Sequence, residues 1–299
     1  MKKVLGSKRN ILLFCLPAII LFAAFVVYPI FSLARLSLMK TDGISYSDYV
    51  GLGTYAQIFR EKIFLRANKR SLYCAAFGFL GIACLGSITA FITSGLRCQI
   101  RRIYKTAFLI PFLLSVTVIS QLWLTIYNYE WGLLNRLLTV LGLGDSVQLW
   151  LGSSKTALPC LMIVGMWWVF GMTVLLVYTS IQSIPASYFE AAQIDGANFW
   201  QNTWYISFPL CKNTIKICMI TQTIAAFYTF PQVYVMTGGG PGEITTTVMM
   251  LIYRETFTNL RYGLSSAMSV LTMIECCLMI ACIAFIMKDR GQGKESLQF

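Results

Sequence analysis

Six long apolar stretches alternate with short polar segments along the chain. They run from about Ile11 to Leu36, Ser71 to Leu96, Thr106 to Tyr127, Ala157 to Ile181, Ile215 to Met236 and Leu264 to Met287. Each is near or above the roughly 20 residues that an α-helix needs to cross a bilayer, where only helices and closed barrels satisfy the backbone. The alternating segments of about ten residues that build membrane β-barrels do not occur. The pattern predicts an all-α integral membrane protein with six transmembrane helices.

The composition supports a single membrane domain. Hydrophobic residues make up 57% of the chain, charged residues make up 12%, and the mean hydropathy is +0.67. These values lie outside the usual range of soluble domains. Six spans with short connections leave no room for a second large soluble domain, so residues 1–299 are expected to form one transmembrane domain. Kinks packed against neighbouring helices are expected at the prolines inside the spans, namely Pro17, Pro29, Pro111 and Pro231.

Lysine and arginine residues set the expected orientation. With six spans both ends of the chain lie on one side, which then carries the larger excess of cations over acids. Its cations are Lys2, Lys3, Lys8, Arg9, Arg97, Arg101, Arg102, Lys105, Lys212, Lys216, Lys288, Arg290 and Lys294. The positive-inside rule therefore places both termini in the cytoplasm. Because the cations lie at the ends of spans and form no basic face, the net charge of +12 does not indicate a nucleic acid partner.

A basic cluster between the first two spans argues against this orientation. Its members fall on the side that is expected to be external, and they are Arg60, Lys62, Arg66, Lys69 and Arg70. Apolar residues interleave with them, namely Ile58, Phe59, Ile63, Phe64 and Leu65. This spacing predicts an amphipathic helix at the membrane interface, within an external segment of about residues 50–70.

Few residues are suited to catalysis or metal binding. The chain has no histidine, and its ten cysteines include no C-x-x-C pair, so no metal site and no catalytic residue is expected. Buried free thiols acting as small hydrophobes explain the cysteines. Glu275, in the middle of the sixth span, is an exception because exposing a carboxylate to lipid costs about 2.5 kcal/mol or more. It can face a cavity, bond to a neighbouring helix or sit protonated. Its role is then either contact with a solute or an ion, or a structural polar contact.

A short polar segment separates the fourth and fifth spans. Ser187 and Glu190 have the spacing of a capping box, which predicts a helix that begins at Ser187. Gly196 is placed to end this helix in a left-handed turn, and Asn198 with Gln201 can begin a second helix. The expected product is a helix, a sharp turn and another helix. It is either an ordinary interfacial loop or a docking surface for a partner in the aqueous phase.

The same segment resembles the EAA signature of the permease subunits of ATP-binding cassette (ABC) importers. That signature is Glu-Ala-Ala, three residues, Gly, nine residues, Ile, one residue and Leu-Pro. The chain matches it at Glu190, Ala191, Ala192, Gly196, Ile206 and Pro209, with Phe208 in place of the leucine. This replacement is apolar for apolar.

Three further segments resemble the narrower group of MalF-like sugar and glycerol-phosphate permeases. They are Gly51-Leu52-Gly53-Thr54-Tyr55, where the group has Gly-Leu-x-Asn-Tyr, Trp131-Gly132-Leu133-Leu134-Asn135, and Met236-Thr237-Gly238-Gly239-Gly240-Pro241-Gly242. The resemblance implies the type I ABC importer permease fold. It also implies a subunit of an ATP-driven, binding-protein-dependent importer, most simply for a sugar or oligosaccharide, in a bacterial cytoplasmic membrane.

In this family a cytoplasmic loop, here about residues 184–212, docks on the ATPase and transmits its closure to the membrane helices. The resemblance assigns this coupling to Glu190, Ala191, Ala192, Asp195, Gly196, Ala197 and Pro209. The chain has no G-x-x-x-x-G-K-[ST] motif, so ATP and Mg²⁺ are expected on a separate ATPase and the chain itself is not an enzyme and binds no cofactor. The implied partners are a second permease, two cytoplasmic ABC ATPase subunits and an extracytoplasmic solute-binding protein.

The resemblance also places a substrate path on the fourth and fifth spans. The residues concerned are Trp167, Trp168, Gln222, Tyr228 and Thr229. Aromatic faces with amide and hydroxyl groups suit a sugar, although each residue is equally explained by packing or lipid contact. A turn near the binding protein is implied for Gly238, Gly239, Gly240, Pro241 and Gly242, with a simple tight turn as the alternative.

Two other classes of membrane protein stay open. A secondary transporter would show inverted repeats and an ion-coupling site in broken helices. A scaffold or insertase-like protein would carry a docking helix but would need no polar groups facing a sugar. Co-purification with an ATPase and a second permease distinguishes an importer from both.

Overall fold

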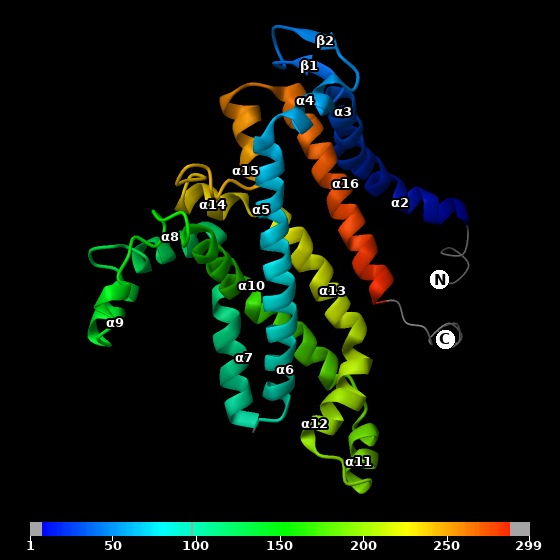
Figure 1. The fold of residues 1–299 in the computed structure, drawn as a ribbon. Coiled ribbons are helices and arrows are strands. Elements are labelled where there is room, and N and C mark those ends of the chain that lie inside the picture. The colour runs from blue at the N-terminus through cyan, green and yellow to red at the C-terminus, as the bar shows by residue number, and fades with distance from the viewer. Residues whose placement is uncertain (1–7, 97, 288–299) are drawn as a thin grey trace. The chain divides into compact units, whose positions relative to one another are not determined.

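A computed structural model describes residues 8–96 and 98–287, and helices dominate them (Figure 1). Some cations of the orientation argument lie outside the described residues, namely Lys2, Lys3, Arg97, Lys288, Arg290 and Lys294. The described chain divides into two compact units. The first unit comprises residues 8–65 and 252–274, and the second comprises residues 66–96, 98–251 and 275–287.

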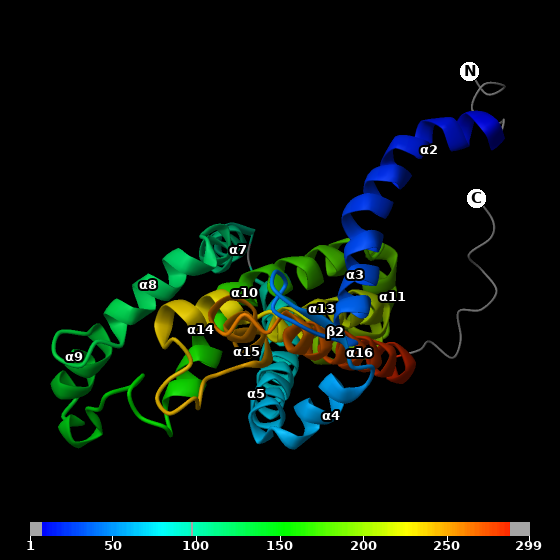
Figure 2. The ribbon, with the colours of Figure 1, turned by 90° about the horizontal axis from the view of Figure 1, so that it is seen from above.

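The first unit begins with one continuous helix, seen in dark blue in Figures 1 and 2. It consists of α2 (Lys8–Phe22), the π-helical segment Ala23–Val27 and α3 (Tyr28–Leu36). Pro29 lies in the first turn of α3, directly after the π-helical segment. Because proline lacks the N–H that an α-helix needs, a local π segment is a common way of continuing the helix past it.

A small hairpin and three helical elements complete the first unit. Strands β1 (Met39–Thr41) and β2 (Ser47–Tyr49) are antiparallel, with Met39 opposite Tyr49. The helical elements are α4 (Gly53–Arg60), the π-helical segment Arg254–Thr258 and the first part of α16 (Tyr262–Ile286). Gly263 lets β1 lie directly on α16, because a Cβ there would be 1.9 Å from the carbonyl oxygen of Met39.

Among the described residues of the second unit, every regular element is a helix, and turns and loops connect them. Its elements are α5 (Lys62–Gly78) from Arg66 onward, the π-helical segment Phe79–Leu85, α6 (Gly86–Ser94), α7 (Cys98–Leu113), α8 (Val116–Ile126), α9 (Leu133–Val140), the 3-10 turn Gly144–Ser146, α10 (Ala157–Gln182), α11 (Ala186–Ile194), α12 (Phe199–Asn202), the π-helical segment Thr203–Ser207, α13 (Phe208–Phe227), α14 (Phe230–Met236), the start of α15 (Val248–Tyr253) and the end of α16. The basic residues Lys62 to Arg70 thus occupy the beginning of α5, which continues into the apolar part of the same helix.

Four helices in the described chain are long and apolar enough to cross a membrane. They are Phe14–Leu36, Lys62–Ser94, Ala157–Gln182 and Tyr262–Ile286, and a fifth arises if Thr106–Leu113 and Val116–Ile126, bent by 104°, form one span. These five match five of the predicted stretches. The stretch from Ile215 to Met236 is divided between α13 and α14, so the total of six spans stays a prediction.

Proline explains the division between α13 and α14. Pro231 lies in the first turn of α14, where its missing N–H does no harm, but a continuous helix through this point would lose a backbone hydrogen bond. Helix α13 therefore ends at Phe227. The Thr229 hydroxyl donates to the carbonyl of Ala226 at 2.6 Å and satisfies one of the free carbonyls at the break.

The bend between α7 and α8 is likewise stabilised by side chains. Pro111 lies inside α7, and Ser115 caps α8 by accepting from the N–H of Val118 at 3.4 Å. The indole Nε1 of Trp168 donates to the carbonyl of Leu114 at 3.0 Å. This bond satisfies one of the carbonyls that the bend leaves without a partner in the helix.

Helix α10 is the centre of the second unit and packs on α6, α7 and α13. Gly171 is essential to this arrangement, because a Cβ at that position would lie 1.7 Å from the carbonyl oxygen of Phe108 in α7. A cluster of buried residues joins α6, α10 and α13, and Phe108 of α7 packs against it. Its members are Ala90, Phe91, Val174, Val177, Tyr178, Ile181, Cys211, Ile215 and Cys218. The cysteines in this cluster are free and buried, as small hydrophobes would be.

Candidate functional site

The polar segment between α10 and α13 forms a helix, a turn and a second helix, as predicted. Its first helix begins one residue earlier than expected, because α11 runs from Ala186 to Ile194 with Pro185 as its N-cap. The predicted Ser187–Glu190 capping box is therefore wrong. With Pro185 at the N-cap, Ser187 falls inside the first turn, and no side chain caps this helix.

Gly196 ends α11 in the predicted left-handed turn, with a φ of +77°. The Ala197 N–H donates to the carbonyl of Ala192 at 2.9 Å, and the Gly196 N–H donates to that of Gln193 at 3.1 Å. This pair of bonds is a Schellman motif. A Cβ at Gly196 would meet nothing within 4 Å, so the backbone conformation and not the lack of space favours glycine here.

The second helix of the segment begins with the predicted capping box. The Gln201 N–H donates to Asn198 Oδ1 at 2.9 Å, and the Asn198 N–H donates to Gln201 Oε1 at 2.8 Å. Helix α12 then runs through the π-helical segment Thr203–Ser207 into α13, whose first turn contains Pro209. Helix α12 is therefore joined to a long apolar helix without an intervening loop.

The outer surface of the segment is exposed. We call residues 185–202, which lie within the predicted loop of about residues 184–212, the coupling loop after the role that the sequence resemblance predicts for it. Glu190, Ala191, Asp195 and Gly196 are exposed, and Ala192 and Ala197 are half-buried. Exposed apolar and aromatic side chains surround them, namely Tyr188, Ile194, Phe199 and Trp200. An uncovered apolar patch on a polar loop is a common mark of a protein interaction site.

The inner side of the coupling loop contacts the ends of α6 and α10. Gly95 lies under the ring of Phe199, because a Cβ at Gly95 would be 2.7 Å from Phe199 Cε2. A hollow of about 350 Å³ lies between these elements, and its lining includes Ser94, Tyr178, Gln182, Phe189, Asn202 and Ser207. The loop therefore touches three helices of the second unit: α6, α10 and α13.

A cavity of about 300 Å³ lies among α5, α10, α13 and α14 of the second unit. Four of the five predicted path residues line it: Trp168, Gln222, Tyr228 and Thr229. Trp167 is not among the lining residues, because it points away from α10 toward α8, where its ring lies 5.7 Å from that of Trp123. The sequence analysis placed both tryptophans on one path, but adjacent positions on a helix point about 100° apart, so only Trp168 faces this cavity.

The polar groups of the cavity wall are anchored to the surrounding helices. Gln222 Nε2 donates to Thr173 Oγ1 at 3.4 Å, and Gln232 Nε2 donates to the carbonyl of Leu161 at 2.5 Å. Gln232 and Thr247 line the cavity and were not predicted. A glutamine within an apolar stretch is a sequence signal that could have identified Gln232. Thr247 lies outside every predicted span, so no such signal marks it.

The glycine turn of residues 237–248 is internally braced. Gly238, Gly239 and Gly242 have φ values of +59°, +96° and +55°, and the Gly240–Pro241 peptide bond is cis. Thr245 Oγ1 donates to the carbonyl of Gly240 at 2.7 Å, and Thr246 Oγ1 donates to that of Gly239 at 3.2 Å. These threonine side chains are buried. The turn is therefore more than a simple tight turn.

Helix α5 fixes the end of the glycine turn. Arg70 Nη1 donates to the carbonyl of Thr246 at 3.2 Å. The Val248 N–H donates to Ser71 Oγ at 3.0 Å, and both residues are buried. The basic end of α5 thus supports the turn that leads into α15.

The remaining two sequence motifs form local scaffolds. Asn135 is buried and donates to the carbonyls of Tyr129 and Gln148 at 3.1 and 3.3 Å, while accepting from Trp150 Nε1 at 2.8 Å. In the first unit, Tyr55 donates to Ser37 Oγ at 2.8 Å. Both motifs hold loops in place, and neither forms part of the cavity.

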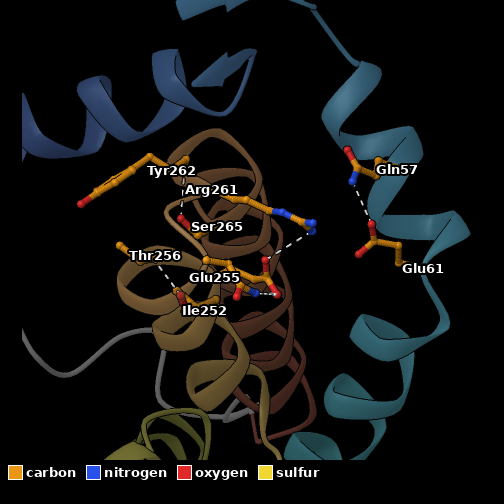
Figure 3. Close-up of polar contacts among 9 residues, drawn as sticks. Gln57, Glu61, Ile252, Glu255, Thr256, Arg261, Tyr262 and Ser265 are labelled. Atoms are coloured by element: carbon orange, nitrogen blue, oxygen red, sulfur yellow. Dashed lines mark hydrogen bonds and ion pairs between the residues drawn. The ribbon is translucent and has the colours of Figure 1, made fainter. Parts of the chain in front are cut away.

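Glu255 in the first unit is a buried acid with a cationic partner (Figure 3). Its Oε1 accepts from Asn259 Nδ2 at 2.9 Å, and its Oε2 lies 3.6 Å from Arg261 Nη1. In the same view Gln57 Nε2 donates to Glu61 Oε1 at 2.8 Å along α4. Among the described residues, no group of three His, Cys, Asp or Glu side chains is placed to hold a metal ion.

Long apolar helices, an exposed helix–turn–helix loop joined to them and a cavity with anchored polar groups define a multi-pass membrane protein built to handle a small solute. Residues 82–290 match the family described as binding-protein-dependent transport system inner membrane component. The chain belongs to this family, and it is therefore a permease component of an ABC importer and not an enzyme.

Individual relatives agree along nearly the whole chain. A probable ABC transporter permease protein of Bacillus subtilis, YurN, is 33% identical over 95% of this chain and 96% of its own length. The trehalose/maltose transport system permease protein MalF of Thermococcus litoralis is 31% identical over 88% of each chain.

A solved structure establishes the type I ABC importer permease fold. A chain of a bacterial alginate ABC transporter, crystallised in complex with an alginate pentasaccharide-bound periplasmic protein, superposes with a TM-score of 0.82. It covers 93% of this chain and 94% of its own length, at 21% sequence identity.

Proposed function

We propose that this permease imports a sugar or oligosaccharide. The observation that supports this most directly is the cavity, where the ring of Trp168 lies with the amide of Gln222 and the hydroxyl group of Thr229. An aromatic face packs on the C–H face of a sugar, and amide and hydroxyl groups bind its hydroxyls. Named relatives point the same way, because they include a trehalose/maltose and a multiple sugar-binding transport permease.

The coupling loop is proposed to dock on a cytoplasmic ATPase. Glu190 would make polar contacts, Ala191 and Ala192 would pack in a groove, and Asp195, Gly196 and Ala197 would form the turn. Two observations support this role: the outer face of the loop is exposed, and its helices continue into α13 past Pro209. Because α12 leads into α13 without a loop, the segment can transmit the closure of an ATPase to the cavity wall.

The proposed assembly contains a second permease subunit, two ATPase subunits that bind ATP and Mg²⁺, and an extracytoplasmic solute-binding protein near Gly238 to Gly242. The chain would act as one permease domain, with a cytoplasmic loop of about residues 184–212 and an external segment of about residues 50–70. It would lie in a bacterial cytoplasmic membrane with both termini inside, since the described cations on that side include Lys212 and Lys216.

The test of coupling uses the complete complex reconstituted in liposomes with its sugar-loaded binding protein. Gly196→Pro and Glu190→Lys should leave the protein in the membrane and abolish the stimulation of ATP hydrolysis. Gly142→Pro is a matched control, because Gly142 has a φ of +76° in the same kind of turn after α9. Full stimulation in both loop variants would contradict the proposal.

The test of the substrate class uses the same complex and a panel of sugars. Trp168→Ala should weaken uptake of the transported sugar, while Trp167→Ala should leave it nearly unchanged, because only Trp168 lines the cavity. Equal effects of the two substitutions would place the sugar elsewhere.

A further inference from the structure

A polar contact joins two apolar helices of the second unit outside the coupling loop. Asn68 in α5 donates from Nδ2 to Oε1 of Glu275 in α16 at 2.7 Å. Glu275 lies in a helix that is otherwise apolar around it, within a stretch that can cross a membrane. The contact answers the question raised by the sequence, because the carboxyl group binds a neighbouring helix.

The second oxygen of each side chain in this pair has no partner. Asn68 Oδ1 and Glu275 Oε2 are both buried, and neither has a hydrogen bond. If the carboxyl group were ionised, both atoms would be acceptors without a donor. Two such atoms on side chains that already share one hydrogen bond require a common explanation, since a buried unpaired acceptor is costly.

No cation neutralises Glu275 in the part of the chain that the structure describes. Arg66, Lys69 and Arg70 lie on α5 near Asn68, but none of their nitrogens is within 4.0 Å of the carboxyl group. The guanidinium of Arg70 is bonded to the carbonyl of Thr246 instead. By contrast, the buried acid Glu255 has Arg261 beside it.

Apart from these basic residues of α5, the cluster that borders the pair is apolar or neutral. Further along the same seam, α5 contributes Cys74 and Ala75, α13 contributes Ala226 and Phe227, and α16 contributes Cys276 and Met279. The only titratable groups in this cluster are the two thiols. An ionised carboxylate here would be both unpaired and poorly solvated, which strongly disfavours the charged form.

We propose that Glu275 carries a proton at neutral pH and forms a closed two-bond ring with Asn68. In this ring Asn68 Nδ2–H donates to Glu275 Oε1, and Glu275 Oε2–H donates to Asn68 Oδ1. The single proton turns Glu275 Oε2 into a donor, and Asn68 Oδ1 is its acceptor, so both oxygens gain a partner. The pair is then neutral, fully hydrogen-bonded and compatible with an apolar surrounding.

The ring positions α16 against the wall of the cavity. Cys74 and Ala226, which belong to the cluster beside the pair, also line the cavity. Glu275 is therefore a positioning residue that acts through its neighbours and does not touch the solute. This inference goes beyond the proposed function and does not depend on which solute is imported.

Infrared spectroscopy of the purified full-length protein tests the protonation directly. The carbonyl stretch of a protonated carboxyl group should be present at neutral pH and should disappear in Glu275→Gln. The matched control is Glu255→Gln, which removes a buried acid that has a cationic partner and should leave the band unchanged. A spectrum that is identical in wild type and Glu275→Gln would overturn the proposal.

Thermal unfolding in detergent provides the second readout. Glu275→Gln should keep the wild-type Tm, because the amide rebuilds both bonds of the ring with Asn68. Glu275→Leu and Asn68→Leu should each lower the Tm, and the double variant should recover part of the loss, because no polar atom is left unpaired. A Tm of Glu275→Gln as low as that of Glu275→Leu would contradict the ring. A wild-type Tm that depends on the presence of sodium ions would also contradict it.

Discussion

The coupling loop and the glycine turn use similar residues for opposite purposes. Both rely on glycine with positive φ and on polar side chains that bind backbone groups. In the coupling loop these bonds stay within each short helix, and the outer face is exposed. In the glycine turn the hydroxyls of Thr245 and Thr246 are buried and bind the carbonyls of the turn itself.

This difference indicates that the coupling loop offers a surface to a partner, whereas the glycine turn stabilises its own conformation. A segment whose polar groups are locally satisfied and whose apolar side chains are uncovered can bind another protein without refolding. A segment whose hydroxyls bind its own backbone keeps its shape without a partner. Substitutions in the loop should therefore impair coupling, and those in the turn should impair folding.

The largest effect on stability is expected in the glycine turn. Gly239→Val combines an unfavourable φ of +96° with a Cβ that would lie 2.6 Å from Thr246 Oγ1, so we expect a loss of about 2–4 kcal/mol. Gly238→Ala is the matched control, because its φ is +59° and no atom lies within 4 Å of the new Cβ. It should cost only about 1 kcal/mol. Thermal unfolding in detergent measures both, and equal losses would refute the bracing of the turn.

A smaller effect is expected at the helix ends of the coupling loop. Asn198→Ala removes the capping box of α12 and should destabilise the protein by about 1 kcal/mol. Ser187→Ala should change stability by less than about 0.5 kcal/mol, because Ser187 does not cap α11. The same unfolding assay applies. A greater loss of stability in Ser187→Ala than in Asn198→Ala would support the Ser187–Glu190 capping box that the sequence predicts and the structure contradicts.

The two capping residues show what local sequence patterns can and cannot predict. The Gly196 turn and the Asn198 cap depend on a few neighbouring residues, and both were predictable. The Ser187 cap failed because the helix begins earlier, at Ala186 directly after Pro185, which leaves Ser187 inside the first turn. Local rules state which caps are available but not which one forms.

Contacts between distant segments were beyond the sequence. Four of the five path residues share one cavity, but the orientation of Trp167 depends on how α10 packs against α7 and α8. That packing is set by the close approach at Gly171, which has no sequence signature. The partner of Glu275 is 207 positions away, so no local pattern pointed to Asn68.

The smallest expected effect is a local pH dependence in the hairpin of the first unit. Asp42 Oδ1 accepts from the N–H groups of Ile44, Ser45 and Tyr46, and these bonds, led by that from Ile44, lower the pKa of Asp42 to about 2. The bonds therefore stabilise the loop above the ordinary pKa of 3.8, and this contribution is lost as the pH falls through about 2.

Asp42→Asn should keep the loop in its folded conformation at all pH values, because the amide oxygen of Asn accepts the same hydrogen bonds without titrating. Asp42→Ala should loosen the loop even at neutral pH. Limited proteolysis of the hairpin over this pH range is the measurement, with the asparagine variant as control. A hairpin cleaved equally in wild type and Asp42→Ala at neutral pH would show that Asp42 does not hold the loop.

Photo-crosslinking of the complete transporter tests the central claim most directly. A photoreactive phenylalanine analogue replaces Tyr188, which is 52% exposed on α11, or Tyr129, which is equally exposed before α9. If the coupling loop docks on the ATPase, position 188 should crosslink to the ATPase subunit and position 129 should not. Crosslinking of the ATPase from position 129 but not from position 188 would contradict the account.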